Sequence, residues 1–320
     1  MSTSWKTRLA EILKREAARH ARKPKMVGSR TADKRWDVLF LCFRQLRQDL
    51  GHGKLDDPAK LKLKHVRALV LHWEGQGLSA STIQNRVSIL RCFARWIGKD
   101  GMIPDTISLV SDPAHGSRRY TTDRDKSWSG AGVDYEAVIE RVRGEDPRVA
   151  LQLELARAFG MRVQEAMVFR PSRSLKQDEQ GNPLLGFREG TKGGLYREVA
   201  VRTDYQKDVL RRVQECAGRG STIPKTKTLE EWRNHFYWVL RKTGITRKAL
   251  GVVPHGLRHE YVHVRYEELT GMTAPVRSCP PAASAASSGD ALRRGKLALS
   301  QEIGHSRPSI IGCYAGSERK

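Results

Sequence analysis

Six side chains in the second half of the sequence are suited to chemistry at a phosphate group. In chain order they are Arg162, Lys192, His255, Arg258, His305 and Tyr314. Cleavage of a phosphodiester without a metal needs a nucleophile, cationic donors for the pentavalent phosphorane and an acid for the departing alkoxide. The six residues include a candidate for each of these roles.

Arginine is well suited to hold the phosphate during such a reaction. A guanidinium can bind two non-bridging oxygens at once, which an ammonium cannot do. Arg162 and Arg258 are therefore the candidate clamp, and His305 is a candidate third donor. Removal of one preorganised donor of this kind typically costs about 3 kcal/mol of transition-state stabilisation.

The other three residues are candidates for the proton transfers and the covalent step. Lys192 lies in the glycine-rich turn 191–194, from which it could enter a groove and protonate the departing 5′ oxygen. His255 is the candidate general base for the Tyr314 hydroxyl. Attack by Tyr314 would give a covalent phosphotyrosine and a free hydroxyl on the DNA, and the covalent bond would conserve the energy needed for rejoining.

Taken together, these motifs resemble the tyrosine recombinases, or phage-type integrases. The resemblance rests on Gly160-Met161-Arg162, on Lys192 in its turn, on His255-Gly256-Leu257-Arg258-His259, and on Gly304-His305 with Tyr314 nine residues after His305. Each motif is common alone, but all four in the family's order are specific. The resemblance implies a site-specific DNA recombinase, the integrase of a mobile element such as a phage, that needs no metal, ATP or other cofactor. It also implies that the covalent intermediate is a 3′-phosphotyrosine and that the freed end is a 5′-hydroxyl. Glu165 matches the family's acidic position and is expected to support Arg162 by an ion pair.

The sequence departs from the family pattern in two places. Arg258 and His305 are 47 residues apart, about twice the spacing usual in the family. We interpret the excess as a low-complexity loop inserted at about residues 271–295. Six residues follow Tyr314, where many relatives carry a helix that docks on the neighbouring protomer.

The charge of the chain predicts a polyanionic partner. The chain has 58 Lys and Arg against 35 Asp and Glu, a net charge of +23, in a globular composition that is 39% hydrophobic. The first 120 residues hold 24 basic and 11 acidic residues, and we expect them to follow the backbone of double-stranded DNA largely without regard to sequence. The candidate DNA contacts on the polar faces of these helices are Lys60, Lys62, Lys64, Arg67, Arg86, Arg91 and Arg95.

The spacing of apolar residues predicts a mostly α-helical fold with a small β-sheet. The predicted domains are a basic N-terminal arm or helix (1–32), a SAM-like helical core-binding domain (33–100), a linker (101–130) and a catalytic domain (131–320). Two strands are expected at residues 184–187 and 196–201, on either side of the turn that carries Lys192.

The resemblance also implies an assembly. Four protomers would act on two DNA sites, each closing around the duplex as a C-shaped clamp, and a DNA-bending accessory protein is a further candidate partner. Five widely spaced cysteines predict neither disulfides nor a thiolate zinc site. With no apolar stretch long enough for a membrane span, the expected location is the bacterial cytoplasm, in association with the nucleoid.

Three alternatives remain open at this point. A non-catalytic relative acting as a regulator or accessory factor would keep the charge but not the full catalytic set. An enzyme similar to type IB topoisomerases would use the same chemistry without site preference. His259-Glu260-Tyr261-Val262-His263 also matches the HExxH motif of zinc proteases, but the usual distant third ligand does not follow, and the motif overlaps the recombinase motif.

Overall fold

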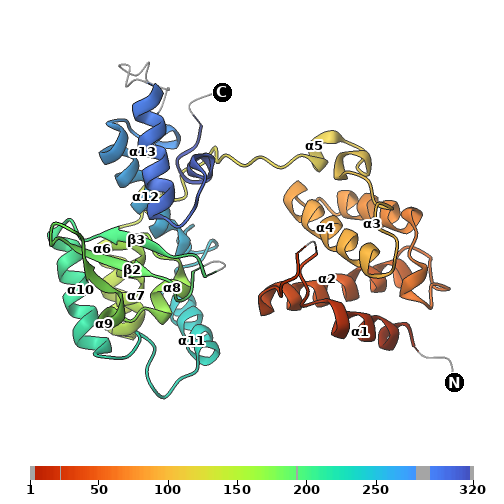
Figure 1. The fold of residues 1–320 in the computed structure, drawn as a ribbon, viewed down its shortest axis with the longest axis horizontal. Helices are drawn as coiled ribbons and strands as arrows, with labels where there is room; N and C mark the ends of the chain where they lie inside the picture. Colours follow the sequence, from red (N-terminus) through yellow and green to blue (C-terminus); the bar gives the residue numbers. More distant parts are fainter. Residues whose placement is uncertain (1–3, 22, 192–193, 279–288, 318–320) are drawn as a thin grey trace. The chain divides into compact units, whose positions relative to one another are not determined.

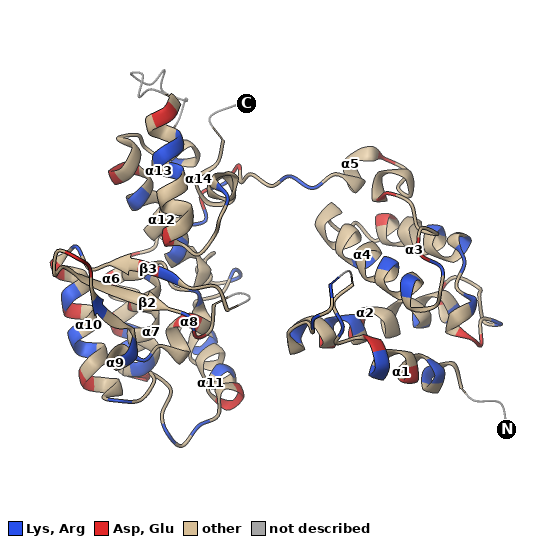
Figure 2. Cartoon of the chain, in the orientation of Figure 1, with Lys and Arg blue, Asp and Glu red and all other residues tan. Residues whose placement is uncertain are grey.

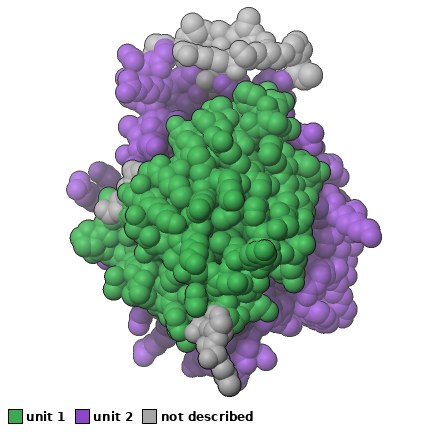
Figure 3. All heavy atoms as spheres, turned by 90° about the vertical axis from the view of Figure 1, so that its right-hand side faces the viewer, with its two compact units in different colours: residues 1–119 green, residues 120–320 purple. Residues whose placement is uncertain are grey.

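The computed structural model describes residues 4–21, 23–191, 194–278 and 289–317 (Figure 1). The chain divides into two compact units, residues 1–119 and 120–320, which Figure 3 distinguishes by colour. Each unit encloses its own hydrophobic core. None of the helices formed by the described residues is both long enough and apolar enough to cross a membrane.

Unit 1 is a bundle of helices. Its elements are α1 (Trp5–Glu16), α2 (Ser29–Gln48), η1 (Pro58–Lys60), α3 (Leu63–Gly75), α4 (Ala80–Trp96), η2 (Thr106–Ser108) and α5 (Pro113–Gly116). Phe43 of α2 and Phe93 of α4 meet edge to face in its core, with ring centroids 5.5 Å apart. The buried indole of Trp73 donates a hydrogen bond of 2.9 Å to Gln45.

The division of the chain differs from the predicted one at both ends of this bundle. Leu9 and Leu13 give α1 an apolar face that is buried in the core of unit 1, so this predicted helix is part of the bundle and not a separate domain. The predicted linker is shared between the units, because Leu109 is buried in unit 1 while Trp128 is buried in unit 2. The indole of Trp128 donates to the carbonyl oxygen of Val253 at 3.0 Å.

Unit 2 combines helices with a small antiparallel sheet of strand order β1-β2-β3, which confirms the predicted fold class. Its strands are β1 (Leu175–Gln177), β2 (Pro183–Phe187) and β3 (Arg197–Ala200). Its longer helices are α6 (Tyr135–Glu145), α7 (Pro147–Phe159), α10 (Asp204–Ala217), α11 (Leu229–Lys242), α12 (His255–Thr270) and α13 (Gly289–Glu302). The short helical segments are η3 (Ser129–Ala131), α8 (Val163–Val168), α9 (Pro171–Ser174), η5 (Pro275–Arg277), η6 (Pro308–Ile311) and α14 (Gly312–Ala315).

The central helix α7 is buried on nearly all of its faces. Its start is set locally, because Pro147 occupies the first turn and the Asp146 carboxylate accepts hydrogen bonds from the backbone of Arg148 and Val149 at 2.8 and 3.1 Å. Gly160 ends the helix in the left-handed conformation, with φ +58°. The chain therefore turns sharply into α8, where the first candidate catalytic residue lies.

The predicted insertion at about residues 271–295 is shorter in the structure. Residues 289–295 form the first half of α13, which packs along α12. A Cβ atom at Gly295 would lie 2.7 Å from the carbonyl oxygen of Leu269, so the two helices approach closely at a glycine. Residues 271–278 include a buried Ala274, and residues 279–288 lie outside the described residues.

Candidate active site

Five of the six predicted catalytic residues come together in unit 2. Four of them, Arg162, His255, His305 and Tyr314, line one cavity of about 720 Å³. The fifth, Arg258, contacts Tyr314 from below the surface. Lys192, on the connection between β2 and β3, lies outside the described residues.

Arg162 is held in place by the start of a helix. It is the N-cap residue of α8, and Glu165 stands three residues later. The Glu165 carboxylate accepts from the backbone nitrogen of Arg162 at 2.9 Å and from its Nη1 at 2.5 Å. The side chain of Arg162 keeps 22% of its surface exposed, enough to present the guanidinium to the cavity.

Glu165 has a wider role than its predicted pairing with Arg162. Its buried carboxylate also accepts from Nη2 of Arg197 at 2.8 Å and lies 3.9 Å from Nη1 of Arg258. Burial alone would raise the pKa of Glu165, but the charges of Arg197, Arg258 and Arg162 hold that pKa below its usual value. One carboxylate thus orients three guanidiniums.

Arg197 is a residue that the sequence analysis missed. Besides Glu165, it binds the carbonyl oxygen of Glu302 through Nη1 at 2.7 Å. The alternation along β3 contains a usable signal, because Arg197 and Val199 face the same buried side of the strand. A buried arginine requires a partner, so the pattern could have marked Arg197 as a paired residue, although not which residue pairs with it.

Arg258 is fully buried and joins three parts of the site. Its Nη1 donates to the carbonyl oxygen of Gly160, its Nη2 to that of Ile303 at 2.5 Å, and its Nε to the Tyr314 hydroxyl at 3.2 Å. Burial lowers the pKa of Arg258 to about 10, which still leaves it charged at neutral pH. The hydrogen bond to Tyr314 places a positive donor on the oxygen of the candidate nucleophile.

His305 follows Gly304, which takes the left-handed conformation with φ +75° at the end of α13. A Cβ atom at Gly304 would lie 2.9 Å from Cδ of Arg197, so only glycine fits this turn without displacing a neighbour. Nη2 of Arg162 and Nε2 of His305 are 3.0 Å apart. The structure thus places His305 beside the first arginine of the predicted clamp.

Two histidines of α12 face the ring of Tyr314. The ring centroids of His255 and His259 lie 5.9 and 4.8 Å from that of Tyr314. The surrounding protein, together with the charges of Arg258 and Arg162, lowers the pKa of His255 to about 4, although the ring keeps an exposed edge. His255 is therefore neutral at pH 7 and can accept a proton, although a pKa this far below neutral makes it a weak base.

The HExxH residues have other partners. Glu260 accepts from the backbone and the hydroxyl of Ser129 at 3.1 and 2.7 Å. Nε2 of His263 lies 2.9 Å from the carbonyl oxygen of Tyr314. Across the described residues, no three His, Cys, Asp or Glu side chains converge as metal ligands. The contacts of His259 and His263 assign them to the support of Tyr314.

The cavity contains further cations that were not predicted. Arg124, Lys126 and Arg247 line it together with Arg162, against a single carboxylate, Asp125. Arg124 and Lys126 lie in the stretch predicted as a linker and belong to none of the predicted motifs. Basic residues occur on both units (Figure 2), but in this cavity they surround the candidate nucleophile.

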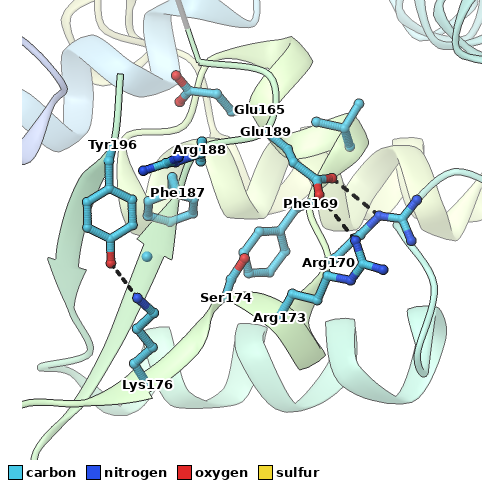
Figure 4. A pocket seen from close by; sticks show the side chains of 12 residues that line it. Glu165, Phe169, Arg170, Arg173, Ser174, Lys176, Phe187, Arg188, Glu189 and Tyr196 are labelled. Atoms are coloured by element: carbon cyan, nitrogen blue, oxygen red, sulfur yellow. Dashed lines mark hydrogen bonds and ion pairs between the residues drawn. The ribbon is translucent and has the colours of Figure 1, made fainter. Parts of the chain in front are cut away.

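A second cavity, of about 410 Å³, reaches Glu165 from the sheet (Figure 4). Three of its four basic side chains have polar partners, and the fourth, Arg188, lies over the Tyr196 ring with its Cζ 5.9 Å from the ring centroid. Arg170 and Arg173 lie 3.3 and 3.5 Å from the Glu189 carboxylate, and Lys176 donates to the Tyr196 hydroxyl at 2.8 Å. The charge available for a phosphate is therefore greater in the cavity that contains Tyr314.

The seven candidate DNA contacts of unit 1 fall into two groups. Four are exposed, namely Lys60, Lys62, Lys64 and Arg67. The other three have intramolecular contacts: Arg86 lies over the Trp73 ring, Arg91 donates to the carbonyl oxygens of Ile103 and Pro104, and Arg95 binds Asp100 and the carbonyl oxygen of Ala21.

The sequence matches the models of two protein families. Residues 118–263 match the integrase family, and residues 10–103 match the family of phage integrase N-terminal domains. No curated protein matches the sequence.

Solved structures share the fold at low sequence identity. A lambda integrase dimer bound to a COC′ core site has a TM-score of 0.61 at 16% identity, over 97% of this chain and 94% of the other. The Tn1549 transposon integrase in complex with transposon right end DNA has a TM-score of 0.54 at 13% identity, over 97% and 93%. The XerH site-specific recombinase bound to a palindromic difH substrate has a TM-score of 0.53 at 14% identity, over 89% and 78%.

Proposed function

The chain belongs to the tyrosine recombinase family of phage-type integrases, and on that basis we propose that it cuts and rejoins DNA at specific sites through a covalent bond to Tyr314. The observation that carries this proposal is the convergence of Arg162, His255, Arg258 and His305 on Tyr314. With Tyr314, these residues come from four separate segments of the chain. Arg162, His255, His305 and Tyr314 line one cation-lined cavity, and Arg258 reaches the phenol from beneath it.

The geometry supports a division of roles. Arg162 binds the non-bridging oxygens of the scissile phosphate, with Glu165 holding its guanidinium in orientation. The predicted second clamp residue, Arg258, is fully buried, with its guanidinium bound to the carbonyl oxygens of Gly160 and Ile303, and it acts on the site through the Tyr314 hydroxyl. His255 accepts the phenol proton, and the Nε–H of Arg258 stabilises negative charge on the attacking oxygen. His305 adds a donor beside Arg162, and Lys192 protonates the departing 5′ oxygen. All bond making and breaking then proceeds with groups of the chain itself and needs no ATP.

The partner of the reaction is double-stranded DNA. The net charge of +23 supports extensive contact with phosphates, and the exposed Lys60, Lys62, Lys64 and Arg67 are the contacts proposed for unit 1. The related structures include a lambda integrase tetramer bound to a Holliday junction, and we extend that arrangement of four protomers to this chain. Action on a mobile element would place it in the bacterial cytoplasm, at the nucleoid.

A nicked suicide substrate tests the nucleophile. On such a substrate the short strand beyond the cleavage site diffuses away, so the covalent protein–DNA adduct accumulates. The wild-type chain should form the adduct, and Tyr314→Phe should bind the same DNA without forming it, because only the hydroxyl is removed. An adduct that persists in Tyr314→Phe assigns the nucleophile to another residue.

Tyr261 provides a matched control. Its hydroxyl is also buried among charged groups, where it binds Glu302 and Arg202, but it lies away from the cavity that contains Tyr314. Tyr261→Phe should keep adduct formation.

Relaxation of a supercoiled plasmid without a specific site would favour the topoisomerase alternative instead.

A further inference from the structure

The short helix α14, which carries the nucleophile, is held by a segment that takes no part in the proposed chemistry. This segment is residues 120–125, here called the strap. The backbone nitrogen of Thr122 donates to the carbonyl oxygen of Gly312 at 2.9 Å. Sγ of Cys313 donates to the carbonyl oxygen of Tyr120 at 2.7 Å. The strap is thus bonded to both residues that immediately precede Tyr314.

The strap also packs tightly against α14. Gly312 has φ −57° and ψ −24°, a conformation open to any residue. A Cβ atom there would nevertheless lie 2.9 Å from Cγ2 of Thr121, closer than such atoms normally approach. Beyond the helix, a Cβ atom at Gly316 would lie 3.3 Å from the carbonyl oxygen of Thr122. At Gly312, therefore, the backbone admits any residue, but a larger side chain must push the Thr121 side chain of the strap aside.

A second contact holds α14 from the side of α12. Nε2 of His263 lies 2.9 Å from the carbonyl oxygen of Tyr314, which requires the proton on that ring nitrogen. The other nitrogen, Nδ1, lies 3.6 Å from Oδ1 of Asp125, the last residue of the strap. Asp125 is itself oriented by Ser127, which donates from its backbone and hydroxyl at 2.8 and 2.6 Å. His263 therefore bonds the nucleophile backbone through Nε2, while its Nδ1 faces the strap without a hydrogen bond.

We infer that the strap and His263 are positioning elements that hold the Tyr314 hydroxyl in line with the scissile phosphate. This inference rests on the proposed function of Tyr314. Because unit 1 ends at Arg119, the strap is also the stretch of chain that joins unit 1 to the nucleophile. Correct placement of a reacting atom is worth a large factor in rate, since a displacement of about 1 Å can cost about 100-fold.

Gly312→Ala tests the inference, because its added methyl group would displace Thr121. In the full chain, we expect single-turnover adduct formation on the suicide substrate to fall by at least about tenfold, with DNA affinity and melting temperature close to wild type. Thr121→Ala removes the methyl group that clashes, so the double variant should recover the rate. Gly144→Ala is the matched control, because nothing lies within 4 Å of a Cβ atom at that helical glycine.

Substitutions of His263 give an independent readout. His263→Gln can still donate a hydrogen bond to the Tyr314 carbonyl and should retain more of the rate than His263→Leu, at equal affinity for DNA. The inference is wrong if Gly312→Ala reacts at the wild-type rate, if Thr121→Ala fails to restore the rate, or if the two His263 variants react alike. Absence of any adduct with the wild-type chain overturns the proposed function, and this inference with it.

Discussion

Replacing Arg162 by lysine tests its proposed contacts with the phosphate while leaving most of the buried polar network in place. Arg162 uses Nη1 for Glu165 and Nη2 for His305, at 2.5 and 3.0 Å. A single ammonium cannot occupy both positions while also meeting two phosphate oxygens. The loss of one preorganised donor is worth about 2.7–4 kcal/mol, so adduct formation should slow by about 100- to 1000-fold.

The fold should survive this change. Glu165 keeps Nη2 of Arg197 at 2.8 Å and the backbone nitrogen of residue 162 at 2.9 Å. We expect the lost charge-assisted hydrogen bond to lower the free energy of unfolding by about 1.5–3 kcal/mol, out of the roughly 5–15 kcal/mol typical of a domain. Arg162→Lys should therefore bind DNA normally and melt only slightly earlier than wild type.

Arg258→Lys provides the contrast, because Arg258 is fully buried. Lysine would leave at least one of the carbonyl oxygens of Gly160 and Ile303 without a donor, at about 1–3 kcal/mol each. This variant should lose both adduct formation and stability. The assay is single-turnover adduct formation at saturating protein, with DNA affinity and thermal unfolding measured separately. If Arg162→Lys forms the adduct within about tenfold of the wild-type rate, the change in activation free energy is less than about 1.4 kcal/mol. That result would refute bidentate binding of the phosphate by Arg162.

Two further predictions concern proton transfer and pH. Lys192→Ala should slow cleavage by about 10²- to 10⁴-fold. A DNA substrate with sulfur in place of the 5′ bridging oxygen should restore the rate of this variant, because a thiolate leaves without protonation. If the rate on that substrate stays low, Lys192 has another role. Burial lowers the pKa of His259 from 6.5 to about 3, so between these pH values the unfolded chain binds a proton that the folded chain does not. The free energy of unfolding should therefore fall as the pH drops through this window, and thermal unfolding of His259→Gln should depend on pH less steeply than that of wild type. Equal slopes would contradict this assignment.

Much of the site was predictable because its residues lie at element boundaries with local signals. Gly160 before Arg162 and Gly304 before His305 mark turns that only glycine makes without strain. The apolar periodicity of the helices and the alternation of the strands likewise depend on neighbours along the chain. The order of the motifs therefore pointed to the family, and the fold class followed from the periodicity.

The tertiary structure alone decided which polar groups meet. Arg197 and the Glu302 carbonyl are 105 residues apart in the chain, and no local pattern reports such a pairing. The same holds for Arg91 and Arg95, which read as a basic helix face but bind carbonyl oxygens within unit 1.

The HExxH residues of α12 likewise show one feature that the sequence determined and another that only the tertiary structure decided. Their spacing places His259 and His263 on one side of a helix, and that much the sequence determines. Only the folded chain brings Tyr314 to that side, so that the histidines contact the ring and backbone of the nucleophile. Buried donors and acceptors must find partners, and the fold decides which distant residues supply them.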